Sequence, residues 1–162
     1  DAGADTENDI QDESACSCVL PAPVTANAYE YAKRLTIREI CPKLSGFRAD
    51  THEKMGHLDH FKNGWTGVHA GDSITFELEG SCIGIQYRKT ISRPAVALAI
   101  VDHDEAHAVT LDANFDEDWG DCLYIEPVLH HGEKKKHTLE ITVLDDESVG
   151  TTPFYLMSII VA

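Results

Sequence analysis

Short segments in which apolar and polar residues alternate run through the second half of the chain. Ile74, Phe76 and Leu78 alternate with polar residues over 73–79, and segment 137–143 has the same pattern. A period of two is typical of β-strands with one face in a core. Further strands are expected at 82–88, 95–101, 108–111, 122–128 and 154–161. The pattern predicts an all-β fold, an antiparallel β-sandwich of jelly-roll type with about eight strands.

The connections between these segments are rich in Asp, Gly and Pro. Gly80-Ser81 predicts a tight hairpin between two strands, and the lysines at 134–136 predict a solvated hairpin turn. Residues 29–37 fit either a strand or a short helix, and we expect an irregular segment leading into a strand. Segment 46–63 is polar and predicts a long surface loop.

The beginning of the chain has a different composition. Residues 1–26 carry six acidic residues and no Lys or Arg, and they include Pro21-Ala22-Pro23. This composition predicts a flexible acidic leader ending in a stiff linker, followed by one β-sandwich domain over 27–162. A linker at this place suggests a further domain in a longer parent protein.

Composition excludes several partners. The net charge of −15 opposes binding to nucleic acid and to anionic lipid surfaces. No apolar run approaches the roughly 20 residues of a membrane span. The chain begins at Asp1 without a signal peptide, which leaves the parent either secreted or cytoplasmic in a bacterium. Five cysteines form an odd set, so we expect no complete disulfide framework.

One motif looks catalytic. Gly71-Asp72-Ser73 matches the nucleophile motif of SGNH (GDSL-type) esterases, and Asp104-Glu105-Ala106-His107 matches their Asp-x-x-His element. However, an alternating strand follows Ser73, where that family has a helix of a parallel α/β fold. A serine nucleophile also needs an oriented base and oxyanion donors on a scaffold. We therefore expect no catalytic residue, and a turn at Asp72 and Ser73.

A longer pattern resembles a known domain. It comprises Gly64-Trp65-Thr66-Gly67, Ala70 to Gly80, and Ile83-Gly84-Ile85-Gln86-Tyr87. Trp119, Tyr124, Leu129, Gly132 and His137 to Ile141 continue it. The chain over 27–162 thereby resembles the accessory, galactose-binding-like jelly-roll domain that stands beside SGNH hydrolase domains. The resemblance implies a non-catalytic module whose partner is the catalytic SGNH-type domain of the same polypeptide, an esterase or acylhydrolase.

Candidate ligand sites are of two kinds. Glycan binding uses exposed aromatic rings, and the available rings are Trp65, Trp119, Tyr87 and Tyr124. The same residues also suit core packing, and we expect both tryptophans to fill the sandwich. Calcium is a possible cofactor, because Asp112, Asn114, Asp116 and Asp118 alternate oxygen ligands and the resemblance implies calcium sites. The nine histidines are expected to be surface residues rather than metal ligands.

These observations favour an accessory domain that positions an acylhydrolase or carbohydrate esterase on glycan or covers its active site. Two alternatives remain: a free-standing carbohydrate-binding module, and a purely structural interaction domain.

Overall fold

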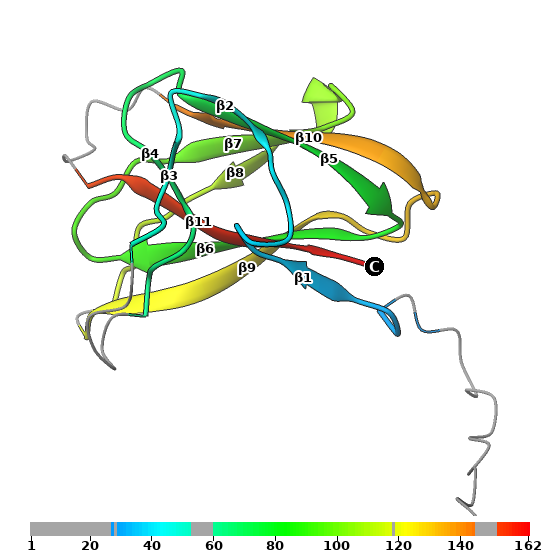
Figure 1. The fold of residues 1–162 in the computed structure, drawn as a ribbon. Helices are drawn as coiled ribbons and strands as arrows, with labels where there is room; N and C mark the ends of the chain where they lie inside the picture. The colour runs from blue at the N-terminus through cyan, green and yellow to red at the C-terminus, as the bar shows by residue number, and fades with distance from the viewer. Residues whose placement is uncertain (1–26, 28, 53–59, 118, 145–151) are drawn as a thin grey trace, which may run out of the picture.

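The computed structural model describes residues 27, 29–52, 60–117, 119–144 and 152–162, so the predicted leader lies outside the described residues. The elements are strands, apart from a single 3-10 turn, η1, at Glu105–His107. The strands, labelled in Figure 1, are β1 (Lys33–Leu35), β2 (Lys43–Ser45), β3 (Arg48–Ala49), β4 (Trp65–Gly67), β5 (Ser73–Gly80), β6 (Ile83–Thr90), β7 (Ala97–Val101), β8 (Val109–Leu111), β9 (Asp121–Leu129), β10 (Lys135–Val143) and β11 (Phe154–Val161).

The strands form two antiparallel sheets that pack face to face (Figure 1). One sheet has the order β3-β4-β11-β6-β9, with β1 also paired to β11, and we call it the β6 sheet. The other has the order β2-β5-β10-β7-β8, and we call it the β10 sheet. The predicted jelly-roll sandwich is confirmed. The three strands beyond the expected eight, β2, β3 and β4, have only two or three residues each.

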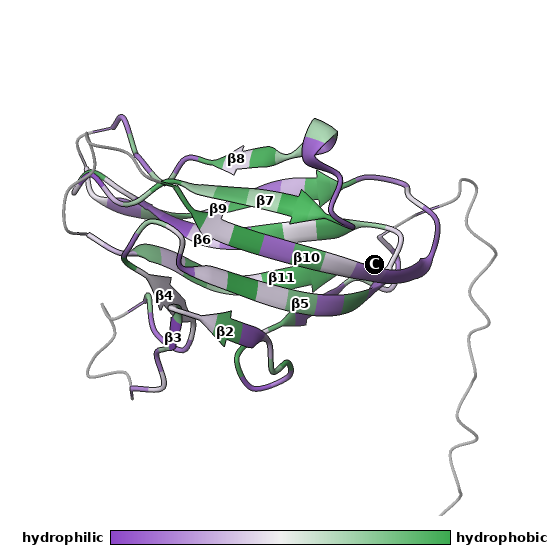
Figure 2. Cartoon of the chain, turned by 90° about the horizontal axis from the view of Figure 1, so that it is seen from above, coloured by the Kyte–Doolittle hydropathy of each residue, from purple (hydrophilic) through white to green (hydrophobic). Residues whose placement is uncertain are grey.

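The core fills the space between the sheets with the inward residues of the alternating strands. Trp65 on β4 is 1% exposed, and its ring lies 5.5 Å from that of Phe76 on β5 in an edge-to-face arrangement. Other inward side chains are Ile74 and Leu78 on β5, Ile83, Ile85 and Tyr87 on β6, Leu139 and Ile141 on β10, and Leu156 and Ile159 on β11. Figure 2 shows the resulting alternation of hydrophilic and hydrophobic residues along β5 and β10.

Two predicted hairpins are wrong, because each connection crosses between the sheets. β5 lies in the β10 sheet and β6 in the β6 sheet, and the same change of sheet separates β9 from β10. At the first crossing, Ser81 N donates to Ala162 O at 2.6 Å. A Cβ on Gly80 would lie 2.8 Å from that same carbonyl oxygen, so the close approach requires glycine. The C-terminal strand therefore holds this turn in place.

The connections gather at the two ends of the sandwich. The end that carries the connections β6–β7, β8–β9 and β10–β11 we call the loop end. The connections β5–β6, β7–β8 and β9–β10 lie at the opposite end, which we call the terminal end. Lys33 pairs with Val161, so the segment before β1 and the C-terminus both leave the sandwich at the terminal end (Figure 1). The described residues contain no helix with the length and apolar character of a membrane span.

Candidate glycan-binding loop

The loop between β8 and β9 displays an aromatic residue to solvent. Trp119 is 66% exposed, so the expectation that it fills the core is wrong. Phe115 packs edge-to-face against it with ring centroids 5.0 Å apart. Asp116 and Glu117, between the two rings in sequence, are also exposed. The loop thus combines an open ring face with flanking carboxylates, which is the chemistry that binds a pyranose ring and its hydroxyls.

Hydrogen bonds to β6 hold the first half of this loop. Thr90, the last residue of β6, donates its N–H to Ala113 O at 2.9 Å and accepts from Phe115 N at 3.2 Å. Ala113 and Thr90 are both buried. Asp112 Oδ1 accepts from the backbone N of Asn114 at 2.9 Å and from its side-chain Nδ2 at 2.7 Å. Phe115 therefore starts from a fixed backbone position and supports the ring of Trp119.

The two predicted tyrosines lie close to each other, one below the surface and one on it. Tyr87 is buried, and its hydroxyl donates to Asp112 O at 3.3 Å, which supports the loop from the core. Burial, followed by the nearby Glu126 carboxylate, raises the pKa of Tyr87. The exposed Tyr124 lies 5.7 Å from Tyr87 between ring centroids, and the ammonium of Lys89 lies 4.5 Å from its ring centroid.

Of the four aromatic candidates, the structure exposes Trp119 and Tyr124 and buries Trp65 and Tyr87. The buried pair offers no ring face to a ligand at the surface. Sequence reasoning missed Phe115. The available signal was its place in an acidic loop four residues before Trp119.

The candidate calcium ligands do not converge in the described part of the loop. The Asp112 carboxylate is engaged by Asn114, as above, and Asp118 lies outside the described residues. Among the residues that the structure describes, no group of three or more His, Cys, Asp or Glu could hold a metal ion. Calcium binding over 112–118 stays a prediction.

The two elements of the esterase-like motif lie apart. Ser73 begins β5 and pairs with Thr142, near the loop end. Asp104, which caps η1, and His107, its last residue, lie at the terminal end, with Asp104 Oδ2 2.8 Å from His107 Nδ1 and the imidazole exposed. Asp72 serves the turn, since its Oδ2 accepts from the N–H of Val68 and of His69, both at 2.9 Å.

A buried histidine is another feature that the sequence did not reveal. His137 occupies an inward position of β10, with Nδ1 2.8 Å from Asp102 Oδ2 and Nε2 3.1 Å from Glu133 O. The other oxygen of Asp102 accepts from Thr138 N at 2.9 Å. This hydrogen bond and the His137 ring lower the pKa of the Asp102 carboxyl. The pair joins the β7–β8 connection to β10, so its role is structural.

Comparison with known proteins relates the sandwich to a domain of an esterase. No family model and no curated protein sequence matches the chain. Among solved structures, a two-domain esterase active on acetylated mannans, co-crystallized with mannopentaose, is 45% identical with a TM-score of 0.80. The match covers 87% of this chain and 39% of that one, so the chain spans about two fifths of the esterase.

Two more distant structures share the fold alone. A family two carbohydrate esterase from Cellvibrio japonicus is 9% identical with a TM-score of 0.51, over 80% of this chain and 33% of that one. A family 6 carbohydrate-binding module from Clostridium cellulolyticum, in complex with xylose, is 17% identical with a TM-score of 0.50. That match covers 78% of this chain and 94% of the module. The predicted resemblance to a β-sandwich domain of an esterase is confirmed.

Proposed function

We propose that the chain is the non-catalytic accessory domain of an SGNH-type carbohydrate esterase, and that it binds the acetylated glycan which the catalytic domain deacetylates. One observation carries the proposal: 45% identity over 87% of this chain accounts for 39% of a two-domain esterase active on acetylated mannans. The remaining length of that esterase has no counterpart in the chain. The sandwich therefore corresponds to one part of an enzyme of this kind.

The β8–β9 loop is the proposed contact with glycan. The apolar face of a mannose unit stacks on the Trp119 ring, which Phe115 holds in place. The Asp116 and Glu117 carboxylates accept hydrogen bonds from sugar hydroxyls. The proposed ligand class is a mannooligosaccharide, because the similar esterase was crystallized with mannopentaose.

Calorimetric titration of the chain with mannopentaose tests this contact. A buried stacking tryptophan contributes about 2 kcal/mol to an interface, so Trp119→Ala weakens binding by about thirtyfold. The matched control is Tyr31→Ala, because Tyr31 is 77% exposed and precedes β1 rather than lying in the loop. Parallel titrations with calcium and with EDTA test the predicted cofactor. Equal affinities for wild type and Trp119→Ala would refute the proposed contact.

The non-catalytic part has a separate test. We expect the purified chain to turn over no chromogenic acetyl ester, because the Asp104–His107 pair lies at the opposite end of the sandwich from Ser73. Measurable turnover that Ser73→Ala abolishes and Ser45→Ala preserves would refute it. Ser45 is a suitable control because it pairs with Ser73 across β2 and β5.

The two alternatives predict different results. A free-standing binding module binds mannopentaose but has no catalytic domain elsewhere in its parent polypeptide. A purely structural domain shows no saturable glycan binding in any of these titrations. The sequence of the full-length parent and the titration together distinguish the three functions.

A further inference from the structure

The outer faces of the two sheets differ in chemistry. On the β10 sheet, the outward positions of β5 and β10 hold Thr75, Glu77 and Glu79, and Thr138, Glu140 and Thr142. Hydroxyls and carboxylates thus dominate this face, with Leu98 and Ile100 at the outward positions of β7 as aliphatic exceptions. The outer face of the β6 sheet instead has aliphatic residues toward the terminal end and cationic side chains, partly from segments outside the strands, toward the loop end.

The aliphatic half contains an open hollow of about 280 Å³. Gly84 on β6 forms its floor, and Ile125 and Pro127 on β9 and Ile160 on β11 form its walls. A Cβ placed on Gly84 would lie 3.6 Å from Ile125 Cγ2 and 3.8 Å from Ile160 Cβ. The absence of a side chain at Gly84 therefore keeps the hollow open. Its lining is almost wholly apolar, which water solvates poorly.

The strand beside this hollow, β9, is an edge strand of the β6 sheet. β9 is the last strand of the β6 sheet and nine residues long, and Leu123 and Ile125 are exposed on it. A long edge strand with exposed aliphatic residues is a surface that proteins normally cover with another element. Asp121, the acid on this face of β9, is paired with Arg88 rather than free to solvate the strand.

The cationic half lies toward the loop end of the same face. A hollow of about 540 Å³ is lined by Arg34, Arg38, His60 and Lys62 against a single carboxylate, Glu39, together with Leu123 and Met157. Between the two hollows, Arg34 Nε donates to Ser158 Oγ at 2.9 Å, and that hydroxyl donates to Gln86 Oε1. A concentration of cations is unexpected on a chain whose net charge is −15. It calls for a partner surface with carboxylates.

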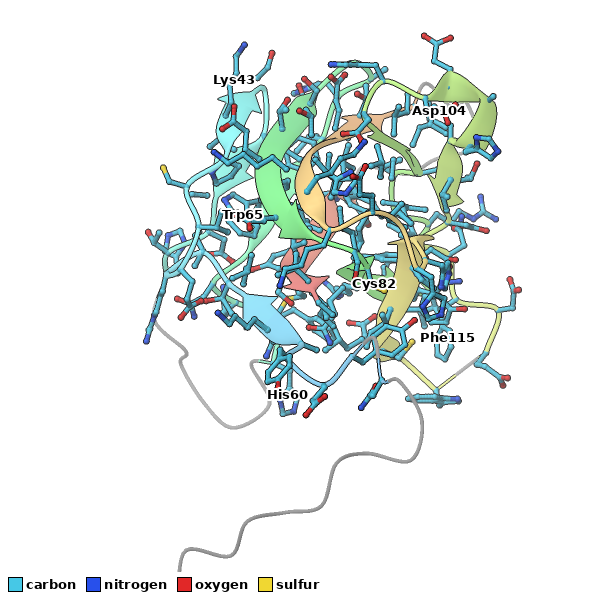
Figure 3. All side chains as sticks on the ribbon, turned by 90° about the vertical axis from the view of Figure 1, so that its right-hand side faces the viewer. Lys43, His60, Trp65, Cys82, Asp104 and Phe115 are labelled. Atoms are coloured by element: carbon cyan, nitrogen blue, oxygen red, sulfur yellow. The ribbon has the colours of Figure 1, made fainter. Side chains whose placement is uncertain are left out.

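Tyr29, among the first described residues, and Ala162, the last, both lie beside the aliphatic hollow and belong to its lining. Tyr29 lies six residues after Pro23 of the predicted linker. Tyr29 is held by an edge-to-face contact with His131, with ring centroids 6.0 Å apart. A domain joined to either end of the sandwich therefore leaves it at this hollow. Such tethering makes docking intramolecular and raises the effective concentration of the neighbour. The side chains around this end are drawn in Figure 3, where Cys82 marks the hollow.

We infer that the outer face of the β6 sheet docks the catalytic domain of the same polypeptide. That domain presents an aliphatic patch to the hollow over Gly84 and carboxylates to Arg34, Arg38 and Lys62. The inference rests on the proposed function and adds to it the surface through which the two domains meet.

The experiment uses the full-length polypeptide and measures its radius of gyration by small-angle X-ray scattering. Ile125→Asp places a charge in the docking face, and Lys62→Glu reverses a charge in its cationic half. Both variants increase the radius of gyration relative to wild type, because the domains separate and move about their tether. The matched control is Ile100→Asp on β7, an outward aliphatic position of the β10 sheet. It leaves the radius of gyration unchanged.

Each outcome bears on the inference. Compact wild-type and Ile100→Asp proteins beside an expanded Ile125→Asp protein support it. An Ile125→Asp protein as compact as wild type, or a wild-type protein already extended, overturns it. A dimer of the present chain in sedimentation that Ile125→Asp abolishes also overturns it, because the face then belongs to a second copy. Equal thermal unfolding of this chain with and without Ile125→Asp confirms that the variant folds.

The same samples separate this inference from the proposed function. Hydrolysis of a small acetyl ester by the full-length protein reports on the esterase, whatever the domains' arrangement. If Ile125→Asp is an active esterase with an unchanged radius of gyration, the docking inference is refuted and the proposed function stands. A full-length protein that hydrolyses no acetyl ester refutes the proposed function.

Discussion

The buried pair of His137 and Asp102 gives a quantitative test of the fold. The His137 ring lies within hydrogen-bond distance of two acceptors, the Asp102 carboxylate at Nδ1 and the Glu133 carbonyl at Nε2. Asp102→Asn removes the negative charge and places an amide opposite Nδ1. The backbone is little affected, because Asp102 has φ 53° and Asn tolerates the left-handed region equally well. The substitution thus isolates the electrostatic contribution.

The expected magnitude follows from the burial of the two side chains. A hydrogen bond to a charged group contributes about 1.5–3 kcal/mol. The His137 side chain is 3% exposed but that of Asp102 is 38% exposed, so solvent screening favours a loss of about 2 kcal/mol. With a urea dependence of about 2 kcal/mol per molar, the midpoint of unfolding falls by about 1 M.

Urea unfolding at pH 7, followed by tryptophan fluorescence, measures this shift, and Asp104→Asn is the matched control. Asp104 and His107 have the same 2.8 Å separation, but that histidine side chain is 84% exposed. The control leaves the midpoint unchanged because water screens the pair. Equal midpoints for Asp102→Asn and Asp104→Asn would refute the reasoning.

The pH dependence of the same variant has a definite sign. The pKa of Asp102 is lower in the folded state than in the unfolded chain, where it is about 3.9. Its stabilisation is therefore present above about pH 4 and is lost as the pH falls through the folded-state pKa. The difference in unfolding free energy between wild type and Asp102→Asn accordingly shrinks near pH 3. A difference that stays constant from pH 7 to pH 3 contradicts this assignment.

Two further predictions concern the core. Burial raises the pKa of Tyr87, so its phenol stays protonated in an alkaline absorbance titration until the protein unfolds, and Tyr87→Phe removes no early-titrating group. This contribution to stability is present below the unfolded pKa of about 10 and is lost at higher pH. Gly67→Ala destabilises the fold by about 1–3 kcal/mol, since its Cβ would lie 2.7 Å from Phe47 and Val143, and calorimetry measures the lower melting temperature.

The strands were predictable because one face of each enters a core. Ile74, Phe76 and Leu78 alternate with polar residues, and all three are buried. The sheet to which each strand belongs was not predictable. Gly80-Ser81 is compatible with a hairpin by local conformation, and the crossing depends on Ala162, which is distant in sequence.

The site was predictable in part. The acidic loop before Trp119 was identified as a candidate ligand site from its composition. Whether Trp119 is buried or exposed could not be predicted, because the residue type alone does not determine exposure. Leu123, Tyr124 and Ile125 are consecutive apolar residues, which break the period of two and indicate a strand that is apolar on both faces. The sequence predicted a strand at 122–128 without determining its burial, and in the structure all three side chains are exposed.

The proposed glycan contact and the proposed docking face meet at the start of β9. Trp119 lies two residues before Asp121, the first residue of β9, and Asp121 lines a hollow together with Arg88 and Lys62. A catalytic domain on the β6 sheet would therefore have Trp119 at its border rather than on the opposite side of the sandwich. A glycan bound to Trp119 would then enter the catalytic domain from a fixed direction. Docking, more than tethering alone, would account for an accessory domain that positions its substrate, because a flexible tether fixes a distance but no orientation.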